Sequence, residues 1–341
     1  MGLFMRRRKF SFLLLLTIAL LSGCASSPGQ LEARAAGITG DQSTSGRVIH
    51  VSVADGSDTN AGTSSHPIRS IQRGIALARP GDTVLIAPGV YRFRGSTQYG
   101  LNLSKSGRSG APITLRGSGP GVILDCSAKT SWRTLYCLNV NGDHWRLVNF
   151  SVRGANQNSE GAWAVGIHFE NASNNLLEGV DSYDHQGPGI LLTGDSRNNL
   201  LRNCKSHSNY DPRSETPGGN ADGVGVTSIP GRATGNVISN CSSYNNSDDG
   251  FDLWQAEAPV TIKGSTASRN GWIPGTRQVA GDGVGFKLGR NTTGPLHQII
   301  GNRAIGNRAS GFDNNGAARR AHLSGNKASG NGGGSYRELY P

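Results

Sequence analysis

Four aspartates in two short segments form the most chemically distinctive pattern in this sequence. The segment NNSDDGFDLW at 245–254 holds three of them, and NADG at 220–223 holds the fourth. In GFDL, alternation along a strand turns Phe251 and Leu253 inward, so Asp252 must face outward. Carboxylates this close together repel one another unless a cation joins them, and an all-oxygen ligand set suits calcium. We therefore expect a calcium site made of Asp222, Asp248, Asp249 and Asp252.

Turn chemistry is the alternative explanation for these aspartates, because Asp-Gly is a common turn signal. It accounts for NADG, for DDG and for the GDG at 281–283, and we assign Asp282 to such a turn. It does not account for Asp252, which lies in the middle of a strand pattern. The calcium hypothesis is therefore preferred for the other four residues.

The GFDL pattern recurs one repeat later as GFKL, with a lysine in place of the aspartate. In GFKL, Phe286 and Leu288 face inward and Lys287 faces outward, while the earlier GVGV leaves Gly225 facing outward. If these segments stack as neighbouring strands, Gly225, Asp252 and Lys287 form one external column. An amine then stands beside the carboxylates, with a glycine leaving room.

A repeat in the second half of the chain supplies the stacking that this column needs. Six segments, which begin at 174, 198, 235, 258, 296 and 319, share one pattern of apolar, polar and small positions. Their leading apolar residues are separated by 24, 37, 24, 38 and 23 residues, a period near 24 with two insertions. Such a period is typical of one coil of a parallel β-solenoid. The leading residues are Leu177, Leu201, Ile238, Ile262, Ile300 and Leu323.

Stacked coils place equivalent side chains about 4.8 Å apart, so recurring residues form ladders. Asn209, Asn246 and Asn270 each follow a leading apolar position by eight residues, which predicts an asparagine ladder inside a turn. Cys204 and Cys241 share another column. We assign all five residues a structural role.

The chain before the repeats is predicted to join the same solenoid. RVIHVSV at 47–53 and DTVLIAPGVY at 82–91 match strand patterns, and IRSIQRGIALA at 68–78 matches an amphipathic helix. We expect this helix to cap the open amino-terminal end, which would otherwise expose strand edges. The fold class is therefore all-β, a parallel β-helix over 47–341 with a short N-terminal capping helix. The predicted apolar face of the helix consists of Ile68, Ile71, Ile75 and Ala78.

The amino terminus carries an export signal. MRRRK is followed by an apolar run at 10–21, too short to span a bilayer, and then by LSGC. LSGC resembles the bacterial lipobox, which makes 1–23 a lipoprotein signal peptide and Cys24 the lipidated first residue of the mature protein. An ordinary signal peptide is the alternative. Ala25 implies sorting to the outer membrane, and the Ser-, Gly- and Ala-rich 24–46 matches a flexible tether.

Charge narrows the possible partners of this exported chain. Its 341 residues carry a net charge of +11, which favours an acidic partner. No basic helix, aromatic stacking motif or zinc pattern supports nucleic-acid binding, which leaves an anionic polysaccharide or a membrane surface. We expect a monomer. An oxidising compartment permits a disulfide between Cys126 and Cys137, and two buried free thiols are the alternative.

NADGVG, SDDGFDLW and GFKLG, in this order, resemble the pectate lyases of polysaccharide lyase family nine, which are right-handed parallel β-helices. The resemblance covers most of the chain from about Arg47 onward. It implies calcium for the four aspartates, a catalytic role for Lys287 and cleavage of an acidic uronan such as pectate by β-elimination. One departure is GVGV in place of a bulkier sequence after NADG, which affects the subsites.

β-Elimination in a uronan requires removal of the proton on C5 and loss of the 4-linked glycosidic oxygen. Calcium beside the substrate carboxylate would stabilise the negative charge that develops. Lys287 must be neutral to take the proton, and a nearby metal would lower its pKa from about 10.4. Loops at 210–219 and 272–280 are expected to flank the cleft. Candidate clamps for substrate carboxylates are Arg213, Arg277 and Arg290.

Three other functions stay open from the sequence. A polygalacturonase-type hydrolase also uses paired aspartates, but its Gly-His-Gly and Arg-x-Lys motifs are not found. A uronan C5-epimerase shares the proton abstraction, and Tyr183, Asp184 and His185 offer it a candidate histidine. A non-catalytic polysaccharide-binding β-helix would leave Lys287 without a chemical role.

Overall fold

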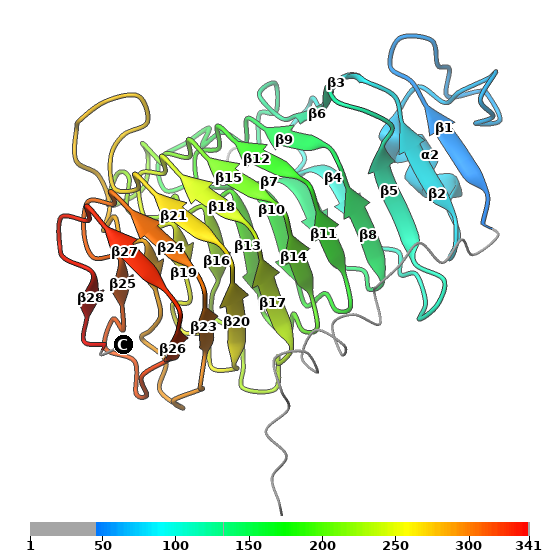
Figure 1. Cartoon of the computed structure of the whole chain (residues 1–341). Helices are drawn as coiled ribbons and strands as arrows, with labels where there is room; N and C mark the ends of the chain where they lie inside the picture. Colours follow the sequence, from blue (N-terminus) through cyan, green and yellow to red (C-terminus); the bar gives the residue numbers. More distant parts are fainter. Residues whose placement is uncertain (1–45, 132, 340–341) are drawn as a thin grey trace, which may run out of the picture.

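The chain winds into a stack of coils, and most turns add one strand to each of three sheets (Figure 1). The computed structural model describes residues 46–131 and 133–339. The expected signal peptide (1–23), Cys24 and all but the last residue of the tether (24–46) lie outside the described residues. The described part confirms the prediction of an all-β parallel β-helix. It contains no helix that is long and apolar enough to cross a membrane.

The strands of each sheet are parallel to their neighbours. Sheet 1 has ten strands in the order β1 (Val48–Val51), β2 (Thr83–Ile86), β5 (Ile113–Gly117), β8 (Trp145–Val148), β11 (Leu176–Glu178), β14 (Leu200–Arg202), β17 (Asn236–Ser239), β20 (Val260–Lys263), β23 (Gln298–Ile300) and β26 (His322–Ser324). Sheet 2 has nine strands in the order β4 (Tyr99–Leu103), β7 (Thr134–Val140), β10 (Trp163–Glu170), β13 (Ile190–Thr193), β16 (Val224–Val226), β19 (Phe251–Asp252), β22 (Phe286–Lys287), β25 (Phe312–Asp313) and β28 (Tyr336–Arg337). Sheet 3 has nine strands in the order β3 (Gly89–Arg92), β6 (Val122–Asp125), β9 (Ser151–Arg153), β12 (Asp181–Tyr183), β15 (Lys205–His207), β18 (Ser242–Tyr244), β21 (Thr266–Ser268), β24 (Arg303–Ile305) and β27 (Lys327–Ser329).

The register of sheet 1 confirms the predicted repeat at every leading position except one. Ile262 pairs with Ile299, and Ile299 pairs with Leu323, so the assignment of Ile300 to this column was wrong. Ile299 is fully buried, whereas Ile300 lies opposite Lys263 and is partly exposed. Two adjacent isoleucines both match an apolar position, and the repeat spacing alone did not separate them.

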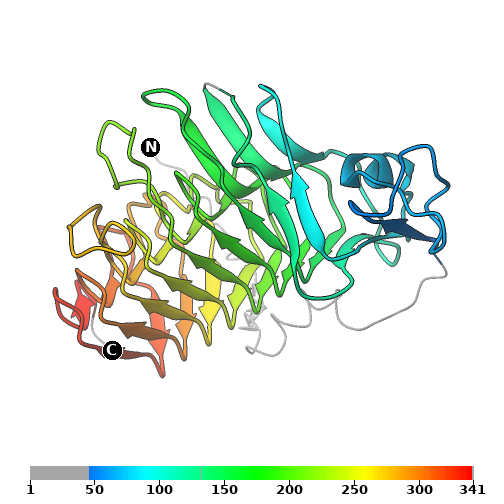
Figure 2. The same ribbon diagram turned by 90° about the horizontal axis from the view of Figure 1, so that it is seen from above.

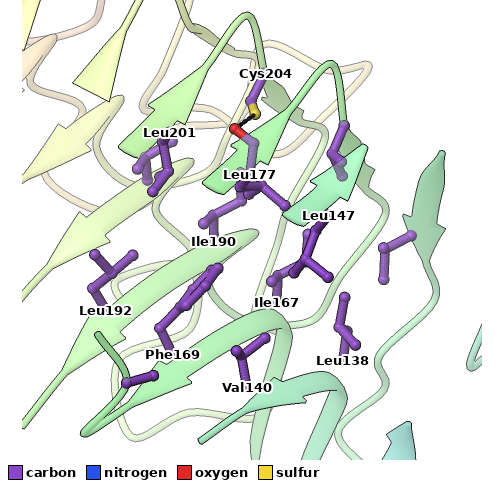
Figure 3. Packing of buried hydrophobic residues seen from close by; sticks show 14 of the residues in the cluster. Leu138, Val140, Leu147, Ile167, Phe169, Leu177, Ile190, Leu192, Leu201 and Cys204 are labelled. Carbon is purple, nitrogen blue, oxygen red and sulfur yellow. Dashed lines mark hydrogen bonds between the residues drawn. The ribbon is translucent and has the colours of Figure 1, made fainter. Parts of the chain in front are cut away.

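The core consists of inward side chains that stack from coil to coil. Figure 3 shows this packing for a part of the cluster that includes Ile167, Phe169 and Ile190. Nearer the carboxyl end, stacked rings at the strands of sheet 2 continue the core. Their centroids lie 4.8, 4.8 and 5.3 Å apart. Each fully buried phenylalanine contributes about 1.5–3 kcal/mol of transfer free energy. The stacked rings are Phe251, Phe286, Phe312 and Tyr336.

The predicted asparagine ladder is confirmed and runs further than predicted. The amide Nδ2 of Asn209 donates to Oδ1 of Asn246 at 2.8 Å, and Asn246 donates in the same way to Asn270 at 3.0 Å. The ladder continues through Asn307 to Asn331. Each Oδ1 also accepts the backbone N–H of the preceding ladder residue. The ladder therefore satisfies buried backbone donors at the corner that leads from sheet 3 to sheet 2.

The amino-terminal segment differs in one detail from the expectation. Helix α2 covers Ile71–Leu77 and starts after Ser70, whose hydroxyl accepts the backbone N–H of Arg73 at 3.2 Å. Ile68 precedes the helix and forms a parallel bridge with Val51 instead. The helix lies beside β1 and β2 at the blue end of the stack (Figure 2). Its capping role stays a prediction.

The four described cysteines form one disulfide and one pair of buried free thiols. Cys126 and Cys137 form a disulfide with their Cα atoms 5.7 Å apart. Cys204 and Cys241 are buried free thiols in adjacent coils, and the backbone N–H of Cys204 points at the Cys241 sulfur at 3.4 Å. The disulfide closes the segment between β6 and β7 within one turn of the solenoid, ahead of the repeats.

We predict that Asn246→Ala destabilises the protein by about 2–4 kcal/mol, because it leaves the buried backbone N–H of Asn209 without its acceptor and also removes the side-chain bonds from Asn209 Nδ2 and to Asn270 Oδ1. The measurement is the free energy of unfolding in denaturant. Asn158→Ala is the matched control, since Asn158 is exposed and we expect its loss to change stability by less than about 1 kcal/mol. Equal stability of the Asn246 variant and the wild type would contradict the structural role of the ladder.

Candidate active site

A cleft of about 470 Å³ lies on the outer face of sheet 2. Carboxylates and a lysine line one end of it, contributed by the strands and corners around β16, β19 and β22. Aromatic and neutral polar side chains from β7, β10 and β13 line the other end. The lining residues at the charged end are Asp222, Asp248, Asp252 and Lys287.

The external column predicted from the GVGV, GFDL and GFKL segments is confirmed. Gly225 pairs with Asp252, and Asp252 pairs with Lys287, on strands whose other side chains are fully buried. The column extends one coil further to Asp313, which pairs with Lys287 and which the sequence analysis did not include. Because strand register fixes the column, the amine and the carboxylate beside it occupy adjacent rungs about 4.8 Å apart.

Three carboxylates form a compact cluster beside this column. Asp222, Asp248 and Asp249 each offer an oxygen, and these oxygens lie within 4.8 Å of one another. The backbone N–H of Asp249 donates to Asp222 Oδ1 at 3.1 Å, and that of Val284 donates to Asp249 Oδ1 at 2.6 Å. Asp222 and Asp249 therefore occupy equivalent positions in adjacent coils, each three residues before the paired Gly225 and Asp252. Asp252 lies in the same cleft but outside this group, and its Oδ1 accepts the backbone N–H of Trp254 at 2.8 Å.

Burial dominates the electrostatics of the cluster. It raises the pKa of Asp222 and of Asp248 well above the usual range, and the charges of the neighbouring aspartates raise both further. Burial also raises the pKa of Asp249, and it raises that of Asp252 to about 7, although Lys287 opposes both shifts. Ionised carboxylates in this position are unfavourable without compensating positive charge.

Lys287 supplies part of that charge. Its Nζ lies 2.9 Å from Asp249 Oδ2 and 2.8 Å from Asp282 Oδ2. Burial lowers the pKa of Lys287, but the carboxylates of Asp249, Asp252 and the other cluster members outweigh burial and raise the pKa above its usual range. The lysine is thus a cation whose position is fixed by two carboxylates.

Asp282 has a larger role than the turn that the sequence analysis assigned to it. It stands between Gly281 and Gly283, both with positive φ, as a turn requires. Its carboxylate also pairs with Lys287, and its backbone N–H donates to Asp248 Oδ1 at 2.6 Å. Arg308 holds the same turn by donating to the carbonyl of Gly281 at 2.7 Å. The sequence did contain a signal for this role. A third Asp-Gly pair follows NADG and SDDG in the next coil, five residues before Lys287.

A family model described as "Pel9A-like, right handed beta helix region" matches residues 49–339. The chain belongs to this family. The match covers both the column and the carboxylate cluster, and it confirms the resemblance and the right-handed β-helix inferred from the NADGVG, SDDGFDLW and GFKLG segments.

Relatives of this family come from sequence and structure comparisons alike. The chain is 33% identical over 278 residues to "Pectate lyase L" from Dickeya chrysanthemi, with 78% of this chain and 61% of that protein aligned. It thus spans about three fifths of that relative's length. A solved pectate lyase Pel9A matches with a TM-score of 0.70 and 30% identity, covering 81% of this chain and 68% of the other. A solved rhamnogalacturonan lyase matches with a TM-score of 0.74 and 30% identity, covering 84% and 75%.

The two insertion loops expected at the cleft lie on the same side of this Pel9A-like β-helix (Figure 2). Gly219 at the end of the first loop and the following Asn220 line the cleft. Asn220 donates to the buried carboxylate of Asp211 at 3.1 Å, which fixes the loop. The loops come together where a Cβ on Gly218 would stand 2.6 Å from the Cβ of Ala280.

Other expected site residues lie away from the cleft surface. Arg213, Arg277 and Arg290 are not among the described residues that line it, and their substrate role stays a prediction. His185 is buried and hydrogen-bonds Ser182, so the candidate histidine of the epimerase interpretation faces the core. Its neighbour Tyr183 stacks on His207 on sheet 3, away from the cleft on sheet 2.

The aromatic and neutral residues at the other end of the cleft were not predicted from the sequence. His168 stacks on Tyr136 with ring centroids 4.3 Å apart, and its Nε2 lies 2.8 Å from the Thr193 hydroxyl. Burial lowers the pKa of His168 to about 4, so this imidazole is neutral at pH 7. Trp163 and Trp254 also line the cleft. These residues share no repeated motif, and only the coiling of the chain shows that they gather with the aspartates.

We predict that calcium raises the melting temperature more at pH 8 than at pH 5. The raised carboxylate pKa values mean that the folded chain binds more protons than the unfolded chain, so stability falls as pH rises from about 4 to about 7. A cation bound only by the folded form at about 100 times its Kd adds about 2.7 kcal/mol, or about 5 °C. The measurement is thermal unfolding with chelator and with calcium at both pH values. A calcium shift that is absent at pH 8, or larger at pH 5, would contradict a cation site in this cluster.

Proposed function

We propose that this chain is a calcium-dependent polysaccharide lyase that cleaves an acidic uronan, most simply pectate, by β-elimination. One observation carries the proposal: the amine of Lys287, whose side chain is only 12% exposed, lies 2.9 Å from a carboxylate of a buried cluster, at the charged end of an open cleft. Family membership and the names of the relatives, which include pectate lyases, support it. Without the four basic residues of the expected signal peptide the net charge is 11 − 4 = +7, which suits an acidic polymer.

The carboxylate cluster fits a hard cation. Its members are buried, their ligand oxygens lie within 4.8 Å of one another, and their pKa values are raised by burial and mutual repulsion. Asp222, Asp248 and Asp249 would hold calcium, with Asp252 beside them. Oxygen-only ligands in a flexible arrangement match the preference of this ion. When bound, the ion supplies positive charge next to the substrate carboxylate.

Lys287 is the proposed base. Asp249 and Asp282 hold its Nζ at the floor of the cleft, where the C5 proton of a bound uronate would be presented. In the reaction the proton moves from C5 to Nζ, the electron pair of that bond forms the C4–C5 double bond, and the C4–O bond breaks. The released glycosidic oxygen takes a proton from water. Lys287 must enter this step neutral, so positive charge on the cluster has to offset the carboxylates that raise its pKa.

We also propose that the mature protein is exported and attached to the outer membrane. The lipobox-like LSGC supports attachment of the mature chain to the outer membrane through Cys24. A pectate lyase held there would act on polymer at the cell envelope. Release of the wild-type protein into the medium in a fully soluble form would contradict the anchor without touching the enzymatic proposal.

Products of an acidic-polysaccharide digest distinguish the candidate functions. We predict unsaturated uronides that absorb ultraviolet light, loss of their formation in chelator and its return with calcium. New reducing ends without absorbance would indicate a hydrolase, inverted sugar configuration an epimerase, and binding without change a non-catalytic protein. Activity that persists in excess chelator would remove calcium from the mechanism.

We predict that Lys287→Ala reduces turnover by at least about 10² to 10⁴-fold, the usual contribution of general-base catalysis. Lys287→Arg should restore little, because a guanidinium stays protonated at any workable pH. Initial rates of unsaturated product formation give the measurement. Lys205→Ala is the matched control, since Lys205 is an exposed lysine on sheet 3 and its loss should leave the rate unchanged. Near-normal rates in the Lys287→Ala variant would place the base elsewhere.

A further inference from the structure

The two ends of the cleft differ in charge. Lys287 and the aspartates form one end, and the other end, here called the aromatic end, consists of side chains on β7, β10 and β13. Among the residues that the structure describes, Lys287 is the one lysine or arginine that lines the cleft. The aromatic end is lined by Tyr136, Trp163, His168, Glu170, Leu191 and Thr193.

Glu170 gives the aromatic end a negative charge, and no lysine or arginine among the described residues lines this end of the cleft. It closes β10 and pairs in register with Thr193 on β13. Glu170 and Tyr136 line the same end of the cleft; burial raises the pKa of Tyr136, and the charge of Glu170 raises it further. Lys287 lies four strands away in sheet 2, about 19 Å at about 4.8 Å per strand. That distance exceeds the screening length of about 8 Å at physiological ionic strength, so Lys287 does not neutralise Glu170.

Hydrogen bonds fix His168 as a neutral group with its donor turned away from the substrate. Asn139 donates its amide to Asn102 at 3.0 Å, which leaves Asn139 Oδ1 to accept from His168 Nδ1 at 3.1 Å. His168 Nε2 is then an acceptor for the Thr193 hydroxyl at 2.8 Å. Thr193 therefore offers oxygen lone pairs, which accept hydrogen bonds from sugar hydroxyls and give none to a carboxylate.

A uronate carboxylate at the aromatic end would face Glu170 and receive no positive charge in return. An uncharged pyranose would instead place an apolar face against the ring of Trp163, because Tyr99 and His168 already stack on the ring of Tyr136, and its hydroxyls against Thr193 and Glu170. This arrangement is the opposite of the charged end, where a uronate is required for the reaction.

We propose that the aromatic end binds an uncharged sugar unit, so that the preferred substrate combines a uronate at Lys287 with a neutral sugar or an esterified uronate several units away. The proposal rests on the proposed function and specifies its substrate class. Glu170 is the residue that selects against negative charge at this position.

Charge variants of Glu170 test the proposal. Three probes serve: fully de-esterified polygalacturonate, partly methyl-esterified polygalacturonate, and rhamnogalacturonan, in which galacturonate alternates with the neutral sugar rhamnose. We expect wild-type protein to have a KM about 3- to 10-fold higher for the fully acidic probe than for the better of the other two. Glu170→Gln should remove this ratio and Glu170→Lys should reverse it. Whichever mixed probe gives the lower KM identifies the neutral sugar or the ester as the natural occupant.

A matched control and a second readout keep the outcomes separate. Glu178→Gln removes a partly exposed carboxylate on sheet 1, outside the cleft, and should leave the wild-type ratio unchanged. Retardation in gels that contain each polysaccharide measures binding without turnover. If no probe yields unsaturated product, the proposed function fails, and the retardation of the Glu170 variants still tests the charge selection. An unchanged ratio in Glu170→Gln and Glu170→Lys, by KM and by retardation, would overturn the inference.

Discussion

The exact stacking of one coil on the next is the constraint on which the rest of this structure depends. Asparagines hold the corner before sheet 2 in five of the six repeat coils, with Asn246 bonded to Asn270 at 3.0 Å, and His185 takes this position in the first coil. The glycine that follows the aspartates must fit against this ladder. A Cβ on Gly223 would stand 1.7 Å from the Ser243 hydroxyl, and one on Gly250 would stand 2.9 Å from the Asn270 amide. The Asp-Gly steps are thus packing requirements that also fix where Asp222 and its neighbours point.

The folded protein tolerates the electrostatically unfavourable carboxylate cluster because its stability does not depend on that cluster. Burial makes ionised Asp222 and Asp248 unfavourable, and only Lys287 and a few backbone N–H groups oppose this. The stabilising free energy comes from elsewhere, from stacked rings such as Phe251 on Phe286 and from ladder hydrogen bonds. A regular core therefore tolerates a locally unfavourable site, as functional sites generally require.

The external column of Gly225, Asp252 and Lys287 could be predicted from the sequence because two periodicities agree there. Alternation along GFDL and GFKL fixed which residues face outward, and the repeat fixed which strands are neighbours. Periodicity failed where two residues satisfied it equally, as at Ile299 and Ile300. It also failed at Asp282, which matches a turn signal but whose backbone N–H and carboxylate both bond to site residues. The aromatic end was beyond reach for a different reason: Tyr136 and His168 belong to no repeated motif, so only three-dimensional coiling brings them to the cleft.

The insertions show how such a solenoid gains specificity without losing register. Equivalent ladder residues are 24 or 37 apart, so the long coils absorb extra chain while the ladder bonds keep their normal length. Most of the extra residues lie between the ladder and sheet 2, after Asn209 in one coil and after Asn270 in another. Loops placed there rise directly beside the aspartates, and Asn220 reaches the cleft from the first of them. Because the sheets keep their pairing through both insertions, the walls of the cleft can vary in sequence while the distance between Lys287 and the carboxylates stays fixed by the strands beneath.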